Sequence, residues 1–102
     1  SELFKSKVEN IIYTNVDNFN FSIEIMAREF NISTKTLTRR TKAIFGQTPN
    51  QLMIECRLNS AQEILLQNPR ISLKEVAKRV GLKNTSYLKS RLTDKFKTFY
   101  EM

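Results

Sequence analysis

The residues between positions 34 and 42 with cationic or hydroxyl side chains are the ones in this sequence best suited to binding another molecule. Their spacing lets one helix face carry five of them: Thr34, Lys35, Thr38, Arg39 and Lys42. No acidic residue interrupts this face. Phosphates attract the cations, and base edges accept hydrogen bonds from arginine, lysine and hydroxyl groups. The pattern therefore indicates a helix suited to a major groove, with the adjacent Arg40 pointing elsewhere, toward phosphate or the rim.

Two short helices joined by a tight turn are predicted to position this face. Ser22 can cap the first helix, and an apolar stripe at three- and four-residue spacing follows it. Asn31 tolerates a left-handed backbone and can end that helix, while Ser33 can cap the second. The second helix is then expected to bury Leu37, Ile44 and Phe45. This is the pattern of a helix-turn-helix.

Helices are also predicted on both sides of this unit. Residues 2–14 form an amphipathic helix that would buttress it, and a polar loop follows at 15–20. After Gly46, Thr48 can cap a long helix over 49–67, with Pro49 in its first position and Gln51 completing a capping box. The apolar surface of this helix is wider than packing against one neighbouring group of helices requires. We therefore interpret it as a rigid spacer between two halves of the chain.

The second half repeats the first. Ser72 stands fifty residues after Ser22, and the same offset relates Ala77 to Ala27 and Gly81 to Asn31. Past the turn the offset becomes 51, so that these pairs also match: Thr34 with Thr85, Leu37 with Leu88, and Phe45 with Phe96. Ser72 and Glu75 can form another capping box. The repeat predicts a second helix-turn-helix.

The final helix, predicted from about Thr85 to Phe96 or beyond, offers a second polar face. We expect it to expose Ser86, Lys89, Ser90 and Thr93, with Arg91 and Lys95 to the side as phosphate contacts. Its aromatic residues could stack on single-stranded bases, but helical spacing favours core packing for Phe96, Phe99 and Tyr100.

The amino-acid composition favours some classes of protein and excludes others. The 102 residues are 40% hydrophobic with two glycines and two prolines, which favours one small helical domain. With one cysteine and no histidine, an intrachain disulfide is excluded and a zinc site lacks its usual ligands. We therefore expect no metal, no cofactor and no enzymatic activity. No apolar run of membrane-spanning length and no signal peptide are recognisable, so we expect a cytoplasmic protein.

Positive charge begins at the first polar face. Residues 1–33 carry three Lys or Arg and five Asp or Glu, a net charge of −2, whereas residues 34–102 carry fourteen and five, a net charge of +9. Charge alone is weak evidence for nucleic acid, but here it coincides with the helix-turn-helix pattern. We predict an all-α fold of about seven helices in a single domain over 1–102, divided into a first half (1–47), a linker helix (48–68) and a second half (69–102).

Two helix-turn-helix units joined by one long helix resemble the AraC-type DNA-binding domain. The matching motifs are Ser33-x-x-x-Leu37-x-Arg39, Gly46-x-Thr48-Pro49, Arg57-Leu58-x-x-Ala61 and Ile71-x-x-x-x-Val76-Ala77-x-x-Val80-Gly81. The resemblance implies transcription regulation by binding double-stranded DNA, with the second helix of each unit in successive major grooves. It also implies base contacts from Lys35, Thr38 and Arg39, near Thr34 and Lys42, and from Thr85, Ser86, Lys89 and Ser90. The sequence departs from the family at Ser90, where arginine is frequent, and at Thr41, where phenylalanine is common.

The leading helix is similar to that of YesN-type response regulators. We therefore expect a two-component context, with a receiver or sensory domain outside this fragment. Because the second unit carries hydroxyls where the first has Arg39, we expect the first to supply most sequence specificity and the second mainly anchorage.

Some alternatives stay open from the sequence. Arg39 could be a solvated surface residue, and Arg57 is expected to be structural, its head bonding nearby carbonyls. The chief rival function is a protein-interaction module whose basic surface docks an acidic partner, such as RNA polymerase.

Overall fold

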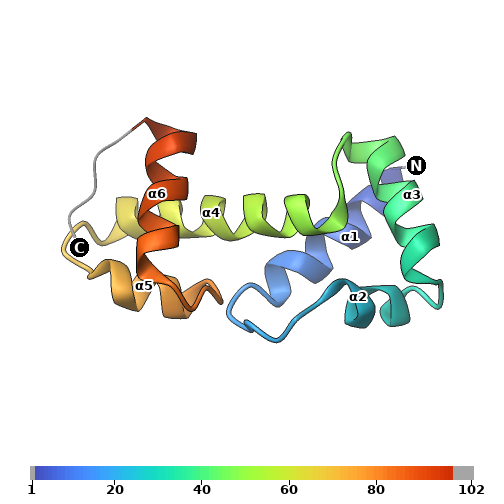
Figure 1. Ribbon diagram of the computed structural model, residues 1–102, viewed down its shortest axis with the longest axis horizontal. Coiled ribbons are helices and arrows are strands. Elements are labelled where there is room, and N and C mark those ends of the chain that lie inside the picture. Colours follow the sequence, from blue (N-terminus) through green and yellow to red (C-terminus); the bar gives the residue numbers. More distant parts are fainter. Residues whose placement is uncertain (1, 98–102) are drawn as a thin grey trace.

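A long central helix joins two groups of shorter helices (Figure 1). The computed structural model describes residues 2–97, which form six helices, close to the predicted seven, and no strand. At one end lie α1 (Glu2–Thr14), α2 (Ile23–Glu29) and α3 (Thr34–Phe45). Helix α4 (Pro49–Gln67) leads to the other end, where α5 (Leu73–Arg79) and α6 (Thr85–Phe96) lie. Phe99 and Tyr100, predicted to pack in the core, fall outside the described residues.

The predicted caps set the bounds of the first unit. The Ser22 hydroxyl accepts a hydrogen bond from the Ile25 amide at 3.3 Å, and Ser33 accepts one from Thr36 at 3.0 Å. Between them Asn31 adopts a left-handed backbone, with φ of 56°. These three positions hold α2 and α3 at a fixed turn, as the sequence predicted.

Helix α4 begins at the predicted capping box and serves two separate cores. The Thr48 hydroxyl accepts from the Gln51 amide, and the Gln51 side chain accepts from the Thr48 amide. Its first half packs into a core with α1, α2 and α3, to which it contributes Leu52, Met53 and Cys56. Its second half packs into a core with α5 and α6, to which it contributes Leu58 and Ala61. The prediction of a spacer packed from both sides is confirmed.

The repeat is also confirmed, with one correction. Ser72 caps α5, and the Asn84 side chain caps α6 in the place where Ser33 caps α3. The capping box predicted for Ser72 and Glu75 was wrong in its second hydrogen bond, the one from the Ser72 amide to the Glu75 side chain. The Glu75 carboxylate instead lies 3.1 Å from Arg79 Nε, because a charged partner is available one turn along the same helix.

Arg57 joins the two halves at the middle of α4. Its side chain is buried, with 5% of its surface exposed. Nη1 donates to the carbonyls of Val16 at 2.6 Å and Val80 at 2.7 Å, and Nη2 donates to that of Asn18 at 3.1 Å. Desolvation lowers the pKa of this guanidinium, partly offset by the charge of Asp17. The structural role predicted for Arg57 is confirmed, and it ties the loop before α2 to the end of α5.

Candidate nucleic-acid interface

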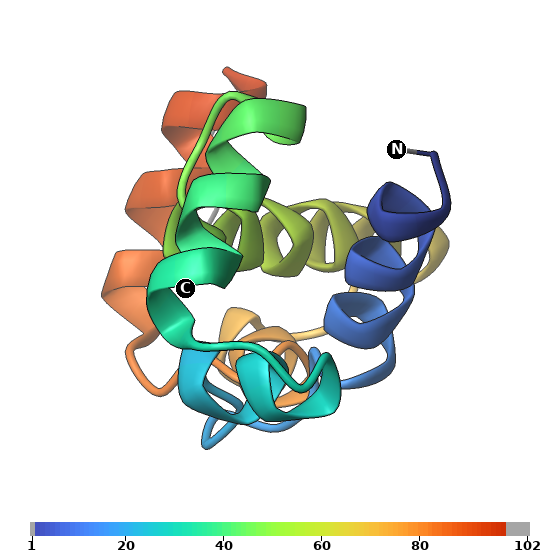
Figure 2. The ribbon, with the colours of Figure 1, turned by 90° about the vertical axis from the view of Figure 1, so that its right-hand side faces the viewer.

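Helices α3 and α6 lie along the same side of the molecule. In Figure 1 both stand across the direction of α4, and both run upward from their first residues to their last. Figure 2, turned by 90°, shows the two helices on one side and α1 on the opposite side. The second helices of the two repeats therefore present their exposed faces together, one at each end of the spacer.

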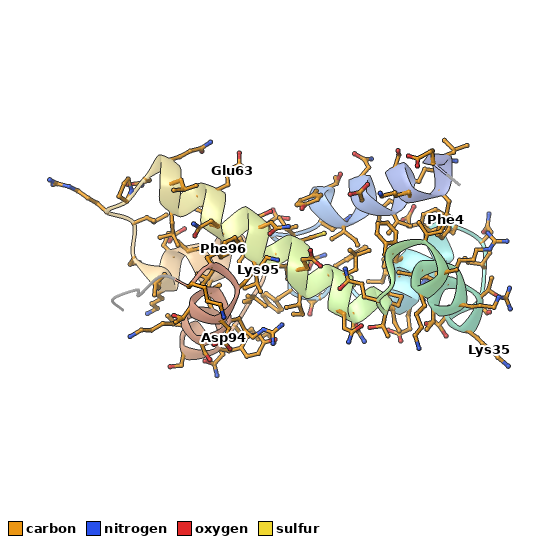
Figure 3. The ribbon with its side chains drawn as sticks, turned by 90° about the horizontal axis from the view of Figure 1, so that it is seen from above. Phe4, Lys35, Glu63, Asp94, Lys95 and Phe96 are labelled. Carbon is orange, nitrogen blue, oxygen red and sulfur yellow. The ribbon has the colours of Figure 1, made fainter. Side chains whose placement is uncertain are left out.

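The exposed face of α3 is cationic. Leu37 and Thr41 are completely buried, so the opposite side of the helix faces solvent. Its exposed cations are Lys35, Arg39, Arg40 and Lys42. Lys35 extends away from the body of the protein (Figure 3). Thr34 and Thr38, predicted on the same face, are half-buried at its margin, so the cations are the outermost groups of this surface.

Arg40 is held at the edge of the α3 face by aromatic packing. Its guanidinium carbon lies 5.8 Å from the centre of the Phe4 ring, and that ring lies 5.2 Å from the Phe30 ring. The contact places the Arg40 guanidinium beside α1. The rim or phosphate contact expected of Arg40 stays a prediction.

The prediction that α3 buries Ile44 and Phe45 needs adjustment. Both are half-buried, whereas Thr41 is completely buried. Position 41 lies one turn after Leu37 and so faces the same core. Among the residues that the structure describes, the Thr41 Oγ1 atom has no hydrogen-bond partner. A polar atom therefore occupies a core position of the first unit.

The exposed face of α6 is rotated relative to the prediction. Ser86, Ser90, Arg91 and Lys95 are exposed, but Thr85, Lys89 and Thr93 are half-buried. Leu88 and Leu92 are completely buried and fix the side of α6 that faces the core. Positions 85, 89 and 96 lie on or near that side and are therefore partly covered. The exposed face consequently includes Tyr87 and Asp94, which were not among the predicted contacts. The spacing of Tyr87 from Ser90 and Arg91 was the signal that could have identified it.

A hollow of about 690 Å³ lies between α6 and the start of α4. Glu55 stands in its wall and links three elements. One of its oxygens accepts a hydrogen bond from Gln47 Nε2 at 2.7 Å, and the other lies 3.7 Å from Lys95 Nζ on α6. Lys95 was predicted to contact phosphate; in this structure it is paired across the hollow with Glu55. Arg91 and Asp94 also line the hollow, so its wall carries charges of both signs.

A second hollow, of about 740 Å³, lies between the loop before α2 and α5. The Phe19 ring is exposed at its edge, with Lys83 Nζ 4.4 Å from the ring centre. Basic residues dominate its lining: Lys74, Lys78, Arg79 and Lys83, against Asp17 and Glu75. The hollow reaches the first residue of α6, Thr85, and includes no residue of α3.

Burial also shifts the pKa of a second group on α4. Desolvation raises the pKa of the Cys56 thiol, which is buried in the first core. Cys56 is therefore a small core residue. No helix among residues 2–97 combines the length and the apolar character needed to cross a lipid bilayer.

Comparison with known proteins finds a matching family and a relative of this chain. A family model described as a helix-turn-helix domain matches residues 26–102. Over 95 residues the chain is 30% identical to a histidine kinase of Formosa agariphila. That match covers 93% of this chain and 7% of the kinase, so the chain spans a small part of that relative's length.

Solved structures share the fold. The C-terminal domain of the two-component response regulator yesN from Fusobacterium nucleatum matches with a TM-score of 0.82 at 20% identity, over 97% of this chain and 94% of that one. The C-terminal domain of AraT, a response regulator from Geobacillus stearothermophilus, gives 0.81 at 22% identity, over 92% and 77%. A DNA-binding transcriptional dual regulator from Escherichia coli gives 0.79 at 22% identity, over 90% and 80%.

Proposed function

The chain belongs to the AraC-type helix-turn-helix family, and from that premise we propose that it binds double-stranded DNA sequence-specifically to regulate transcription. In this proposal α3 and α6 enter successive major grooves. The observation that carries it is the placement of both helices on one side of the molecule, at opposite ends of α4. Successive major grooves on one face of B-DNA lie about 34 Å apart, and two helices on one side of a spacer suit that repeat.

The rigidity of the spacer supports two linked contacts. Helix α4 is one uninterrupted element that contributes to both cores, and Arg57 bonds to backbone carbonyls from both halves. Neither unit can reorient without breaking these buried contacts. The spacing of the two helices is therefore part of what would select the DNA site.

Each unit has a distinct role in the proposal. On α3, Arg39 is the residue assigned to read guanine, because its forked guanidinium can donate two parallel hydrogen bonds to O6 and N7. Lys35 and Thr38 flank it, and Arg40 and Lys42 neutralise backbone phosphate. On α6 the proposed contacts are Thr85, Ser86, Lys89 and Ser90 to the DNA, with Arg91 and Lys95 to phosphate.

One chain is sufficient for two contacts. Helices α3 and α6 run in the same direction, so the two half-sites need not be related by a two-fold axis. The proposed target is a pair of unlike elements about one helical turn apart, bound by a monomer.

The relatives suggest a context for this activity. The histidine kinase and the two response regulators named above are, by their names, components of two-component signalling. We propose that this domain is likewise the output module of a longer signalling protein with a receiver or sensory domain.

A second candidate function rests on the hollow beside Phe19. An exposed ring surrounded by Lys74, Lys78 and Lys83 suits an acidic protein segment, such as one presented by RNA polymerase. Charge reversal of Lys74 and Lys78 would distinguish the two functions. It should abolish capture of an acidic partner, whereas the ratio of the affinities for a selected and a random duplex should stay nearly unchanged.

The proposed function is tested by duplex binding in a mobility-shift assay at several salt concentrations. Specific binding should weaken steeply with salt, since phosphate contacts release counterions. A random duplex at the same ionic strength is the matched control. Equal affinity for selected and random duplexes would show electrostatic attraction alone and would contradict sequence-specific binding.

A further inference from the structure

We infer that Phe19 positions α6 for DNA binding, through its contact with Lys83 in the turn that precedes this helix. The inference rests on the proposed function and deepens it by naming a residue that sets the spacing of the two DNA elements. Phe19 acts through Lys83, so its role requires no contact between the Phe19 ring and DNA.

The first observation is the contact itself. Phe19 is 53% exposed, in the loop between α1 and α2, and Lys83 Nζ lies 4.4 Å from the centre of its ring. This distance is well inside the range at which an ammonium group is attracted to an aromatic face. Figure 1 shows the loop beside the turn that joins α5 to α6. The pair therefore links the first half of the chain to the second, outside both cores.

The second observation is how close this contact lies to the start of α6. Lys83 is followed by Asn84, whose side chain caps α6 by accepting a hydrogen bond from the Tyr87 amide at 2.9 Å. The helix itself begins at Thr85. Because the peptide unit between residues 83 and 84 is rigid, a shift of Lys83 would move the cap and the first turn of α6.

The third observation is that the loop is anchored on both sides of Phe19. Before it, the carbonyls of Val16 and Asn18 accept hydrogen bonds from Arg57 at 2.6 and 3.1 Å. After it, the amide of the buried Phe21 donates to the Asn18 carbonyl at 3.0 Å. The Phe19 ring is therefore presented by a loop that is tied to the spacer helix and to the first core.

Arg57 and Phe19 hold the second unit at different points. Arg57 donates to the Val80 carbonyl at 2.7 Å, at the end of α5, whereas Phe19 contacts Lys83, just before α6. Two separate contacts restrict rotation of the turn between α5 and α6 more than either does alone. An exposed cation–π pair corresponds to about two- to fivefold in an equilibrium constant, which bounds its effect on DNA affinity.

The test compares duplexes that differ in the spacing of the two elements. They are the selected duplex, duplexes with the spacer lengthened or shortened by a single base pair, and a duplex that keeps only the first element. The spacing penalty is the loss of affinity when the spacer is altered. Phe19→Leu should lower affinity for the selected duplex about two- to fivefold and reduce the spacing penalty, since a less restrained α6 can adjust to other spacings. Affinity for the first-element duplex should not change.

Two further variants serve as controls. Phe19→Tyr retains the ring face and should keep the wild-type affinities. Tyr13→Leu is the matched control for loss of an exposed ring, because Tyr13 is 43% exposed but lies on α1, on the opposite side of the molecule from α6. It should leave the spacing penalty unchanged.

A double-mutant cycle tests whether Phe19 acts through Lys83. DNA attracts the Lys83 charge directly, so Lys83→Met should weaken binding to every duplex. Phe19→Leu added to that variant should cause no further change in the spacing penalty, because the pair is already broken. A full effect of Phe19→Leu in the Lys83→Met background would overturn the assignment to Lys83.

The outcomes separate this inference from the proposed function. Failure of the wild type to prefer any duplex would overturn sequence-specific binding and this inference with it. Sequence-specific binding with an unchanged spacing penalty in Phe19→Leu would overturn the role of Phe19 alone. The same conclusion would follow if Phe19→Leu weakened binding to the first-element and two-element duplexes equally.

Discussion

Arg57 and Gly81 meet at the junction between the two halves, where a Cβ atom on residue 81 would overlap Arg57 Nη1 and the Val16 carbonyl oxygen. Gly81 also adopts a left-handed backbone, with φ of 72°. A side chain at this position is thus excluded both by conformation and by the buried guanidinium. The relationship explains why the repeat places glycine here and asparagine at position 31 of the first unit.

Gly81→Ala should therefore destabilise the protein far more than an ordinary glycine substitution. Gly46→Ala is the matched control, since Gly46 has a φ of 73° and open space around it. We expect about 1 to 2 kcal/mol for the control, from the left-handed backbone alone. Displacing the buried Arg57 should add about 3 kcal/mol to the loss at position 81. Urea unfolding measures both, and equal losses would contradict the role of Arg57 as the link between halves.

Thr41→Val should stabilise the protein. The substitution keeps the shape of the side chain and removes a buried hydroxyl that has no partner among the described residues. We expect a gain of about 1 kcal/mol in the free energy of unfolding, because the desolvation cost of that hydroxyl disappears. Thr38→Val, at a half-buried position on the same helix, should change stability by less than about 0.5 kcal/mol. A loss of stability in Thr41→Val would mean that the hydroxyl is satisfied in solution.

Glu55→Gln should strengthen binding to every duplex. Glu55 lies 3.7 Å from Lys95 Nζ, so it neutralises a cation that our proposal assigns to phosphate. Removing its charge should raise affinity about two- to fivefold, in proportion to an exposed ion pair, and should steepen the salt dependence. Glu63→Gln is the control, because Glu63 is exposed on the edge of α4 away from α6 (Figure 3). Equal effects from both substitutions would indicate net charge rather than the Lys95 pair.

Arg39→Ala should relax base preference in the first element. We expect a loss of about 1 to 3 kcal/mol at the selected site, with little change on random duplexes, because a bidentate contact to a base is lost. Arg40→Ala is the comparison, since Arg40 packs near Phe4 at the rim. It should weaken all duplexes alike and make the salt dependence shallower. Uniform weakening by Arg39→Ala would assign that residue to phosphate instead.

The sequence predicted the helices well because their limits are set locally. Ser22, Ser33 and Thr48 cap helices through bonds to amides three residues along, and such signals are visible in the chain itself. The apolar spacing likewise predicted which helix faces pack inward. The structural role of Arg57 was also predicted, but its partners were not, because Val16 and Val80 are brought to it only by the tertiary fold.

The candidate interface was less predictable. On α6 the half-buried positions 85 and 89 follow from how Leu88 and Leu92 fill the core, which rotates Tyr87 onto the exposed face. The pairing of Glu55 with Lys95 joins residues forty positions apart, so no local pattern contains it. The predicted Ser72–Glu75 box failed for a local reason, since Arg79 competes for the same carboxylate.

The central claim is that one chain places α3 and α6 in successive major grooves, and selection from a random duplex library with the wild-type protein tests it most directly. We expect enrichment of a non-palindromic site made of two unlike elements about one helical turn apart, bound by one protein molecule. Insertion of about five base pairs between the elements should abolish the preference, since it moves them to opposite faces of the duplex. Enrichment of a palindrome, or of a single element that tolerates any spacing, would contradict the account.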